Sequence, residues 1–326
     1  MNIQIMMGRF LSRRIGLLAL VALWLGAAGC EPPNPDANTS TSGKLVVYVD
    51  EIYAPMFRVL ADSFMTKSPN AKIEVRSAPA RMVMQNLFDA AARETVVSDT
   101  GTVTAAVVGR MLLPDEQEAI ASAGFDSKEY VLAYDGLAVV VPVSSPVRYS
   151  TLEQLRSALR SPSPSLSGLD SAAPQEPLRF LFPDQNSSVY AVVRRLLLND
   201  SNVAAPARYL STGDSVLNGV AAGEGVGVMG WLAAHRDSSR LRTLPLGFID
   251  STGGIHSPAA IHPTSLVTDA YPLKQPIVGY TFASSRSLAV GFLAWLARGQ
   301  DAQFYMGHQG LQPENARIRI VLPERE

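Results

Sequence analysis

"EYVLAYDGLAVVVP", residues 129–142, is a long, largely apolar run that only Asp135 and Gly136 interrupt. Apolar, β-branched residues in an unbroken run are typical of a buried strand. A mean strand has about 5–6 residues, so this run is long for one strand. Its two apolar halves therefore indicate a segment that leaves one domain and enters another.

Strand-like and helix-like patterns alternate on the N-terminal side of this run. Period-2 or continuous apolar stretches predict strands at 44–50, 71–77 and 102–109. Amphipathic stretches between and after them predict helices at 55–67, 81–93 and 114–124. An alternating order of strands and helices predicts a mainly parallel, doubly wound sheet.

A second α/β unit follows the run, and the chain then returns to the first. The second unit has predicted strands at 178–182, 225–230 and 241–249 and predicted helices at 150–160, 189–198 and 213–223. The stretch 271–282 predicts a return strand, and 285–310 predicts one long amphipathic helix. The fold class expected is therefore α/β, with two doubly wound domains and a ligand cleft between them at the carboxyl ends of the strands. Domain I would comprise 44–136 and 275–326, and domain II would comprise 137–274.

The N-terminus predicts export and a lipid anchor. Three arginines precede the uncharged run "IGLLALVALWLGAAG" (15–29), which is typical of a secretory signal peptide over residues 1–29. "LGAAGC" (25–30) resembles the bacterial lipobox, in which the cysteine, here Cys30, is lipidated. "SRRIGLL" (12–18) also resembles a twin-arginine export signal, which leaves the export route open. Residues 30–43 lack aliphatic side chains and predict a flexible tether, so we expect a membrane-anchored lipoprotein on the periplasmic side of the cell envelope.

Composition excludes several classes of function. Without the leader, 25 Lys+Arg face 29 Asp+Glu, a net charge of −4, which argues against a nucleic-acid partner. Cys30 is the only cysteine, and the four histidines have no metal-like spacing. Because the sequence also lacks the common catalytic motifs, we expect neither an enzyme nor a bound cofactor or metal.

Polar residues follow three of the predicted strands. Asp50 and Glu51 follow the first strand, Arg110 follows the third, and "DQNSS" (184–188) follows the strand at 178–182. An arginine at the end of a buried strand needs an acidic or anionic partner. That partner could be a bound oxyanion, or it could be Asp50, Glu51 or Asp135 in an ion pair.

The third of these strand ends leads directly into a helix. Asn186, Ser187 and Ser188 precede apolar residues at helical spacing in "FPDQNSSVYAVVRRLLL" (182–198). Small polar side chains at this position can cap a helix. They can also bind an anion together with the free N–H groups of the first turn. Taken alone, the stretch favours the cap.

Several segments resemble the substrate-binding proteins of phosphate ABC transporters, which are PstS-like and have the type 2 periplasmic-binding-protein fold. The resemblance covers nearly all of residues 44–312. The segments that carry it are "AYDGLAVVVPVSSPVRYSTLEQLR" (133–156), "VGRMLLPDEQE" (108–118), "VAAGEGVGVMGW" (220–231), "YPLKQPIVGYTF" (271–282) and "VGFLAWLARGQDAQFYMGHQGLQP" (290–313). It implies capture of an oxyanion, with inorganic phosphate as the expected ligand, and delivery to an ABC transporter permease.

The resemblance also shifts the interpretation of 186–188 toward an anion site. The family's "GSGT" signature is here "NSSV" (186–189), and its Gly/Ser/Thr-rich loop after the first strand is here Asp50 to Tyr53. The predicted ligand-binding residues are Asp50, Glu51, Ser77, Arg110, Asn186, Ser187 and Ser188. Arg110 would supply charge, the three residues of the helix start would supply donors, and Asp50 or Glu51 would accept a ligand proton. A different anion, a small organic ligand, or a signalling or adhesion lipoprotein on the same fold are the alternatives.

Overall fold

The structure, a computed structural model, describes residues 38–94 and 101–315. The predicted signal peptide, Cys30 and residues 31–37 of the predicted tether lie outside the described residues. The remainder of that tether is not free of the fold as expected. The Asn38 side chain donates to Gly101 O and accepts from Leu288 N–H (3.2 and 2.8 Å), and the first strand begins at Gly43.

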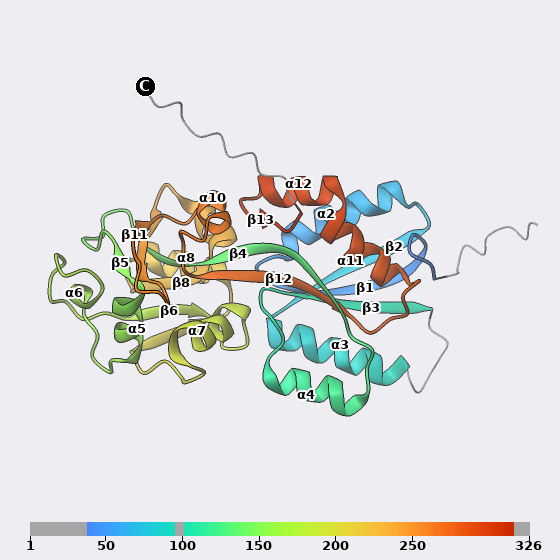
Figure 1. Cartoon of the computed structure of the whole chain (residues 1–326), viewed down its shortest axis with the longest axis horizontal. Helices are drawn as coiled ribbons and strands as arrows, with labels where there is room; N and C mark the ends of the chain where they lie inside the picture. Colours follow the sequence, from blue (N-terminus) through green and yellow to red (C-terminus); the bar gives the residue numbers. More distant parts are fainter. Residues whose placement is uncertain (1–37, 95–100, 316–326) are drawn as a thin grey trace, which may run out of the picture. The chain divides into compact units, whose positions relative to one another are not determined.

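The N-terminal elements form the predicted α/β alternation (Figure 1). They are β1 (Gly43–Asp50), α2 (Ala54–Lys67), β2 (Ala71–Ala78), α3 (Ala80–Glu94), β3 (Thr102–Val108) and α4 (Pro114–Ala123). β1 pairs in parallel with both β2 and β3. The carboxyl ends of these strands, with Asp50 and Gly109, therefore meet at one edge of the sheet.

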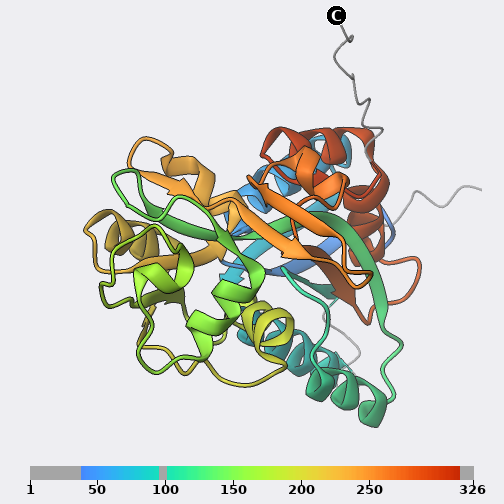
Figure 2. The same ribbon diagram turned by 60° about the vertical axis from the view of Figure 1, so that its left-hand side comes forward.

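β4 (Lys128–Pro142) is a single strand that changes partners along its length. Its first half pairs antiparallel with β12 (Lys274–Thr281), where Asp135 lies opposite Gln275. Its second half pairs antiparallel with β8 (Val226–Gly230) and β9 (Leu241–Thr243). The change of partner occurs at Asp135 and Gly136, the residues that interrupt the apolar run. In Figures 1 and 2, β4 (green) and β12 (orange) cross the middle of the fold as neighbouring strands.

The remaining elements before β12 form a second α/β group. They are β5 (Ser150–Thr151), α5 (Leu152–Arg160), α6 (Leu166–Leu169), β6 (Phe180–Pro183), α7 (Ser188–Leu198), β7 (Ala207–Leu210), α8 (Gly213–Ala221), α9 (Trp231–Ala234), a 3-10 turn (His235–Asp237), β10 (Leu246–Ile249), β11 (Ile255–Ala259) and α10 (Pro263–Val267). β6 pairs in parallel with β7 and β8. Along the main path the large sheet has the order β2-β1-β3-β12-β4-β8-β6-β7, and β11-β10-β5 form a separate sheet.

The predicted long helix at 285–310 is wrong in one respect. It is two helices, α11 (Leu288–Arg298) and α12 (Gln300–His308), followed by β13 (Gln312–Pro313). Gly299 separates them with extended backbone (φ −69°, ψ 124°), and a Cβ there would lie 2.5 Å from Trp295 O. α11 packs against β1, β3, β4 and β12.

The division into domains at 136/137 and 274/275 stays a prediction.

Burial explains why these elements form where they do. α2 buries one face, with Met56, Phe57, Leu60 and Phe64, against the sheet. On the other side α3 buries Val83, Met84 and Leu87 against β3 and β12. Helices on both faces leave the strand ends as the place where polar side chains gather.

Candidate functional site

Two hydrogen bonds join the predicted site residues across large sequence distances. The backbone N–H of Gly109, after β3, donates to the Ser188 hydroxyl over 3.0 Å. The backbone N–H of Arg81, in the first turn of α3, donates to the Asn186 carbonyl over 2.9 Å. The start of α7 is therefore held against the strand ends that carry Asp50 and Arg110.

Asp50 is fully buried at the end of β1. Neither of its carboxylate oxygens has a hydrogen bond of regular geometry within the described part of the chain, although the Ser188 hydroxyl and the N–H groups of Gly109 and Ile52 lie close to it. Burial raises the pKa of Asp50, and the nearby Ser188 hydroxyl and Arg110 charge oppose this shift only in part. A buried carboxyl of this kind is costly unless a donor or a proton satisfies it.

Glu51 and Asp184 add two carboxylates beside Asp50. Glu51 is partly buried, and burial, followed by the negative charges of Asp50 and Asp184, raises its pKa to about 7. Its Oε1 also lacks a partner among the described residues. This side of the site is acidic, so a dianion could bind here only if a proton lies between it and a carboxyl group.

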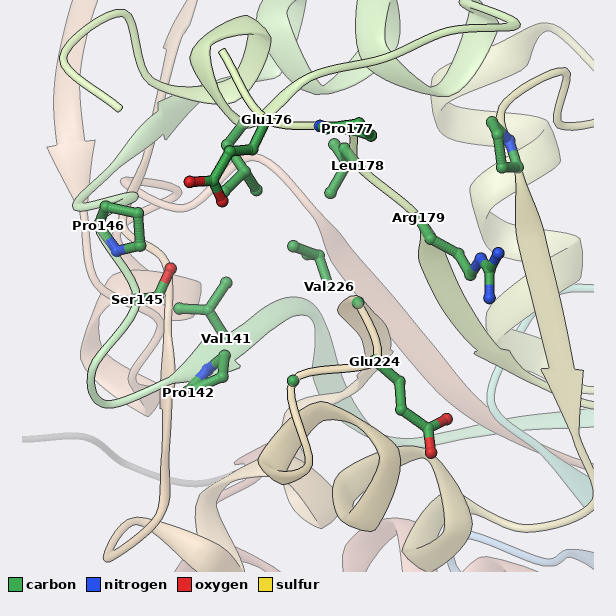
Figure 3. Close-up of a pocket in the computed structure, with 14 residues that line it drawn as sticks. Val141, Pro142, Ser145, Pro146, Glu176, Pro177, Leu178, Arg179, Glu224 and Val226 are labelled. Carbon is green, nitrogen blue, oxygen red and sulfur yellow. The ribbon is translucent and has the colours of Figure 1, made fainter. Parts of the chain in front are cut away.

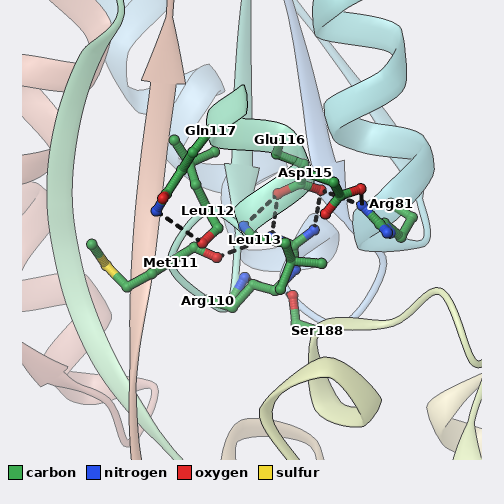
Figure 4. Close-up of polar contacts among 10 residues, drawn as sticks. Arg81, Arg110, Met111, Leu112, Leu113, Asp115, Glu116, Gln117 and Ser188 are labelled. Carbon is green, nitrogen blue, oxygen red and sulfur yellow. Dashed lines mark hydrogen bonds and ion pairs between the residues drawn. The ribbon is translucent and has the colours of Figure 1, made fainter. Parts of the chain in front are cut away.

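Arg110 is 3% exposed and forms a bidentate ion pair with Glu116 of α4 (Figure 4). Nη1 and Nη2 donate to the two carboxylate oxygens at 2.7 Å each, and Nη1 also donates to Met111 O at 3.0 Å. The carboxylate partner is thus Glu116, not the Asp50, Glu51 or Asp135 considered from sequence. Nε of Arg110 has no partner among residues 38–94 and 101–315 and stays able to donate.

The start of α7 shows both of the roles that the sequence left open. Ser187 is the N-cap, and its hydroxyl accepts from Tyr190 N–H over 3.2 Å. Ser188 instead directs its hydroxyl toward the loop that carries Arg110 (Figure 4). Asn186 is exposed, and its backbone N–H donates to the Asp184 carboxylate over 2.7 Å. Capping therefore occupies Ser187, whereas Ser188 lies among the strand ends.

The structure does not bring Ser77 to this group. Ser77 is exposed on β2 and lies opposite Val49, whereas Asp50 lies opposite Ala78. Because side chains alternate between the faces of a strand, Ser77 points to the other face from Asp50. Its predicted role in binding has no geometric support.

Three buried polar residues next to the site, Tyr53, Asp135 and Gln275, were not among the predicted ligand-binding residues. The Tyr53 hydroxyl donates to Asp135 Oδ2 and accepts from Gln275 Nε2, each over 3.1 Å. Asp135 Oδ1 accepts from the N–H groups of Gly136 and Leu232 at 2.8 and 3.2 Å. Burial raises the pKa of Asp135 to about 6. The signal in the sequence was Asp135 itself, a carboxylate within an apolar run.

A cavity of about 460 Å³ lies elsewhere, at the amino ends of β6 and β8 (Figure 3). It is lined by residues that include Pro142, Pro146, Glu176 and Arg179, and none of the predicted site residues lines it. Ligands of open α/β sheets bind at the carboxyl ends of strands, which is the opposite end. This cavity is therefore separate from the candidate site.

Comparison with known families agrees with this architecture. A family profile described as a PBP superfamily domain matches residues 34–300. The chain belongs to the PBP superfamily. This confirms the predicted α/β fold class of the type 2 periplasmic binding proteins. No curated protein matches the sequence.

Several solved structures share this fold at low sequence identity. A putative phosphate ABC transporter substrate-binding protein with bound phosphate from Clostridium perfringens is 16% identical, with a TM-score of 0.64 over 83% of this chain and 99% of that chain. An ABC-type phosphate transport receptor from Vibrio cholerae is 15% identical, with a TM-score of 0.60 over 82% and 99%. The regulatory domain of a LysR-family regulator from N. meningitidis is 9% identical, with a TM-score of 0.50 over 83% and 97%. The fold of this PBP superfamily member is thus shared by transport receptors and by regulatory domains.

Two kinds of feature are missing from the described residues of this PBP superfamily member. Among residues 38–94 and 101–315, no three His, Cys, Asp or Glu side chains are placed to hold a metal ion. In the same part of the chain, no helix has both the length and the apolar character to cross a membrane.

Proposed function

We propose that this protein is the substrate-binding component of an ABC importer and captures inorganic phosphate or a similar oxyanion. The observation that carries the proposal is the buried Asp50 carboxyl, which lies beside the Ser188 hydroxyl and Arg110 and has no hydrogen bond of regular geometry within the described residues. The likeness to phosphate-binding receptors of the same fold supports phosphate as the ligand.

Binding would use the groups that the fold gathers at the strand ends. Arg110 would supply a positive charge through its Nε, while Glu116 holds the other two nitrogens in place. Ser187, Ser188 and Asn186 would supply donors at the start of α7. Asp50 would accept a hydrogen bond from the protonated oxygen of monohydrogen phosphate, and Glu51 would stay partly protonated near neutral pH.

The role of Asp50 predicts a preference for phosphate over sulfate, which carries no proton at neutral pH. We expect the parent protein to bind phosphate and to reject sulfate in calorimetric titrations. Asp50→Asn replaces the acceptor with a group that can donate, so it should bind sulfate more tightly and phosphate more weakly. If the parent binds neither anion, or if Asp50→Asn keeps the parent's preference, Asp50 does not select the ligand.

Delivery to a transporter and the lipid anchor are further parts of the proposal. They rest on the lipobox-like "LGAAGC" and on the likeness to transport receptors. Mass spectrometry of membrane-extracted protein should find diacylglyceryl on Cys30. Deletion of the gene should reduce phosphate uptake by cells.

One observation favours a second function, ligand sensing without transport. The regulatory domain of a LysR-family regulator shares the fold. The same α/β fold can therefore serve regulation as well as uptake. Normal phosphate uptake in the deletion strain, with phosphate binding retained by the purified protein, would support this signalling or adhesion role.

A further inference from the structure

A cavity of about 210 Å³ adjoins the proposed anion site. Three segments line it: the loop after β3, the part of α7 from Ala191 to Leu196 and the start of β12. Arg110 belongs to both the cavity and the anion site, and α7 begins at Ser188 and continues into the cavity wall at Ala191. A ligand held at Ser188 and Arg110 would therefore have this space beside it.

Two buried polar groups of the cavity wall lack partners. Arg110 is 3% exposed and Gln275 is 1% exposed, and both side chains line the cavity. Arg110 Nε, a donor, and Gln275 Oε1, an acceptor, have no hydrogen-bond partner within the described residues. Unpaired buried polar groups cost free energy, so a bound group that offers both an acceptor and a hydroxyl would recover it.

The charges of the cavity wall favour a negative group. Arg195 is exposed and has no ion-pair partner among the residues that the structure describes. The Nζ atom of Lys274 lies 3.5 Å from Asp269 Oδ1 and donates a hydrogen bond to Leu266 O. Glu116 already pairs with two of the three Arg110 nitrogens, and the proposed function assigns the third, Nε, to the anion. The uncompensated cation is thus Arg195, on the α7 side of the cavity.

The rest of the wall is apolar and suits a short carbon chain. It consists of Met111, Leu113, Ala191, Val192, Leu196 and Pro276. The volume is below the roughly 300–1,000 Å³ of sites for drug-sized ligands, so only a small organic group fits. Inorganic phosphate at the strand ends would leave this space unused.

We propose that the cavity is a second subsite, which takes the hydroxylated carbon chain and terminal carboxylate of a small phosphorylated carboxylic acid. The phosphate group would bind at Asp50, Arg110 and Ser188, and the carboxylate would bind Arg195. This inference rests on the proposed function, because the subsite can contribute only when a phosphate group binds at the strand ends. The test must therefore separate failure of the subsite from failure of the proposed function.

Calorimetric titration of three probes into the parent protein makes that separation. The probes are inorganic phosphate, glycerol 3-phosphate and 3-phosphoglycerate, which differ in the group that would enter the cavity. We expect 3-phosphoglycerate to bind at least about threefold more tightly than phosphate, since its hydroxyl would pair with the buried Gln275 Oε1 and its carboxylate with the exposed Arg195. Glycerol 3-phosphate, which lacks the carboxylate, should bind between them.

Variants of α7 assign the effect to the cavity. Arg195→Ala should weaken 3-phosphoglycerate about threefold, as expected for loss of an exposed charge pair, and leave phosphate unchanged. Arg194→Ala is the matched control, because Arg194 lies outside the cavity and donates to Asp200 O. Ala191→Phe should fill the cavity and weaken both organic phosphates while phosphate still binds.

The outcomes distinguish the two proposals. Phosphate binding without any gain from 3-phosphoglycerate, or equal effects of Arg195→Ala and Arg194→Ala, would overturn the second subsite and leave the proposed function intact. Failure of all three probes to bind the folded parent would overturn the proposed function and, with it, the subsite.

Discussion

The backbone N–H of Gly109 donates to the buried Ser188 hydroxyl over 3.0 Å, although 79 residues separate them. Gly109 also packs against the Tyr53 ring, and a Cβ at Gly109 would lie 2.6 Å from the Tyr53 hydroxyl oxygen. Tyr53 in turn donates to Asp135, at the point where β4 changes partners. Packing at a glycine thus links the start of α7 to the middle of the longest strand.

Gly109→Ala should destabilise the protein and weaken anion binding. The added methyl group would displace Tyr53, and overpacking of this kind costs about 1–3 kcal/mol. Urea unfolding and phosphate titration measure the two effects. Gly168→Ala is the control, because its Cβ would have no neighbour closer than 3.6 Å and alanine favours a helix. Equal stability of the two variants would mean that Tyr53 can shift freely.

Arg110→Ala should lower the free energy of unfolding as well as the affinity for phosphate. It leaves Glu116 buried without its partner, and loss of one member of a buried pair costs about 3–5 kcal/mol. Replacement of both members, as Arg110→Met with Glu116→Leu, should recover much of the stability but not the affinity. Urea unfolding and calorimetry separate the two roles. Normal phosphate binding by the double variant would show that Arg110 serves only the fold.

Glu51 should make the protein less stable as the pH rises. Its pKa is raised from 4.5 to about 7, so the folded state holds a proton that the unfolded chain has released between these values. The pKa of Asp135, raised to about 6, acts in the same direction at the acidic end of this range, and burial also raises the pKa of Asp50. The Tm should therefore fall between about pH 5 and about pH 8.

Glu51→Gln removes the part of this effect that Glu51 contributes. The variant should melt higher than the parent at about pH 8 and show a smaller change in Tm with pH. Glu118→Gln, at an exposed position of α4, is the control and should follow the parent. A Tm of the parent that rises over this range would contradict the prediction.

Asp135→Ala should be more harmful than Asp135→Asn. Alanine leaves the buried N–H groups of Gly136 and Leu232 and the Tyr53 hydroxyl without their acceptor, each at about 1–3 kcal/mol. Asparagine keeps one carbonyl oxygen for the two N–H groups. The free energies of unfolding in urea rank the two variants, and equal losses would show that the charge, rather than the acceptor, matters.

Local pattern was enough to predict the α/β alternation and the long segment at 129–142. Apolar runs and amphipathic periodicity depend on neighbours along the chain, so strands such as β1 and helices such as α2 could be found from the sequence. The break at Gly299 was missed because the apolar residues on both sides of it continue the helical spacing, which hides the extended backbone of Gly299 (ψ 124°). The end of the tether was missed because Asn38 is held by Gly101 and Leu288, which are distant in sequence.

The sequence by itself determined which polar residues end the strands: Asp50 and Glu51, Arg110, and the group 184–188. Only the tertiary structure decided what each of them does there. Ser187 caps α7 while Ser188 meets Gly109, and Arg110 pairs with Glu116 rather than with the acids considered from sequence. Ser77 turns away because the register of β2 on β1 puts Ala78, not Ser77, opposite Asp50. Hydrogen bonding and strand register depend on distances between remote segments, which the order of residues does not contain.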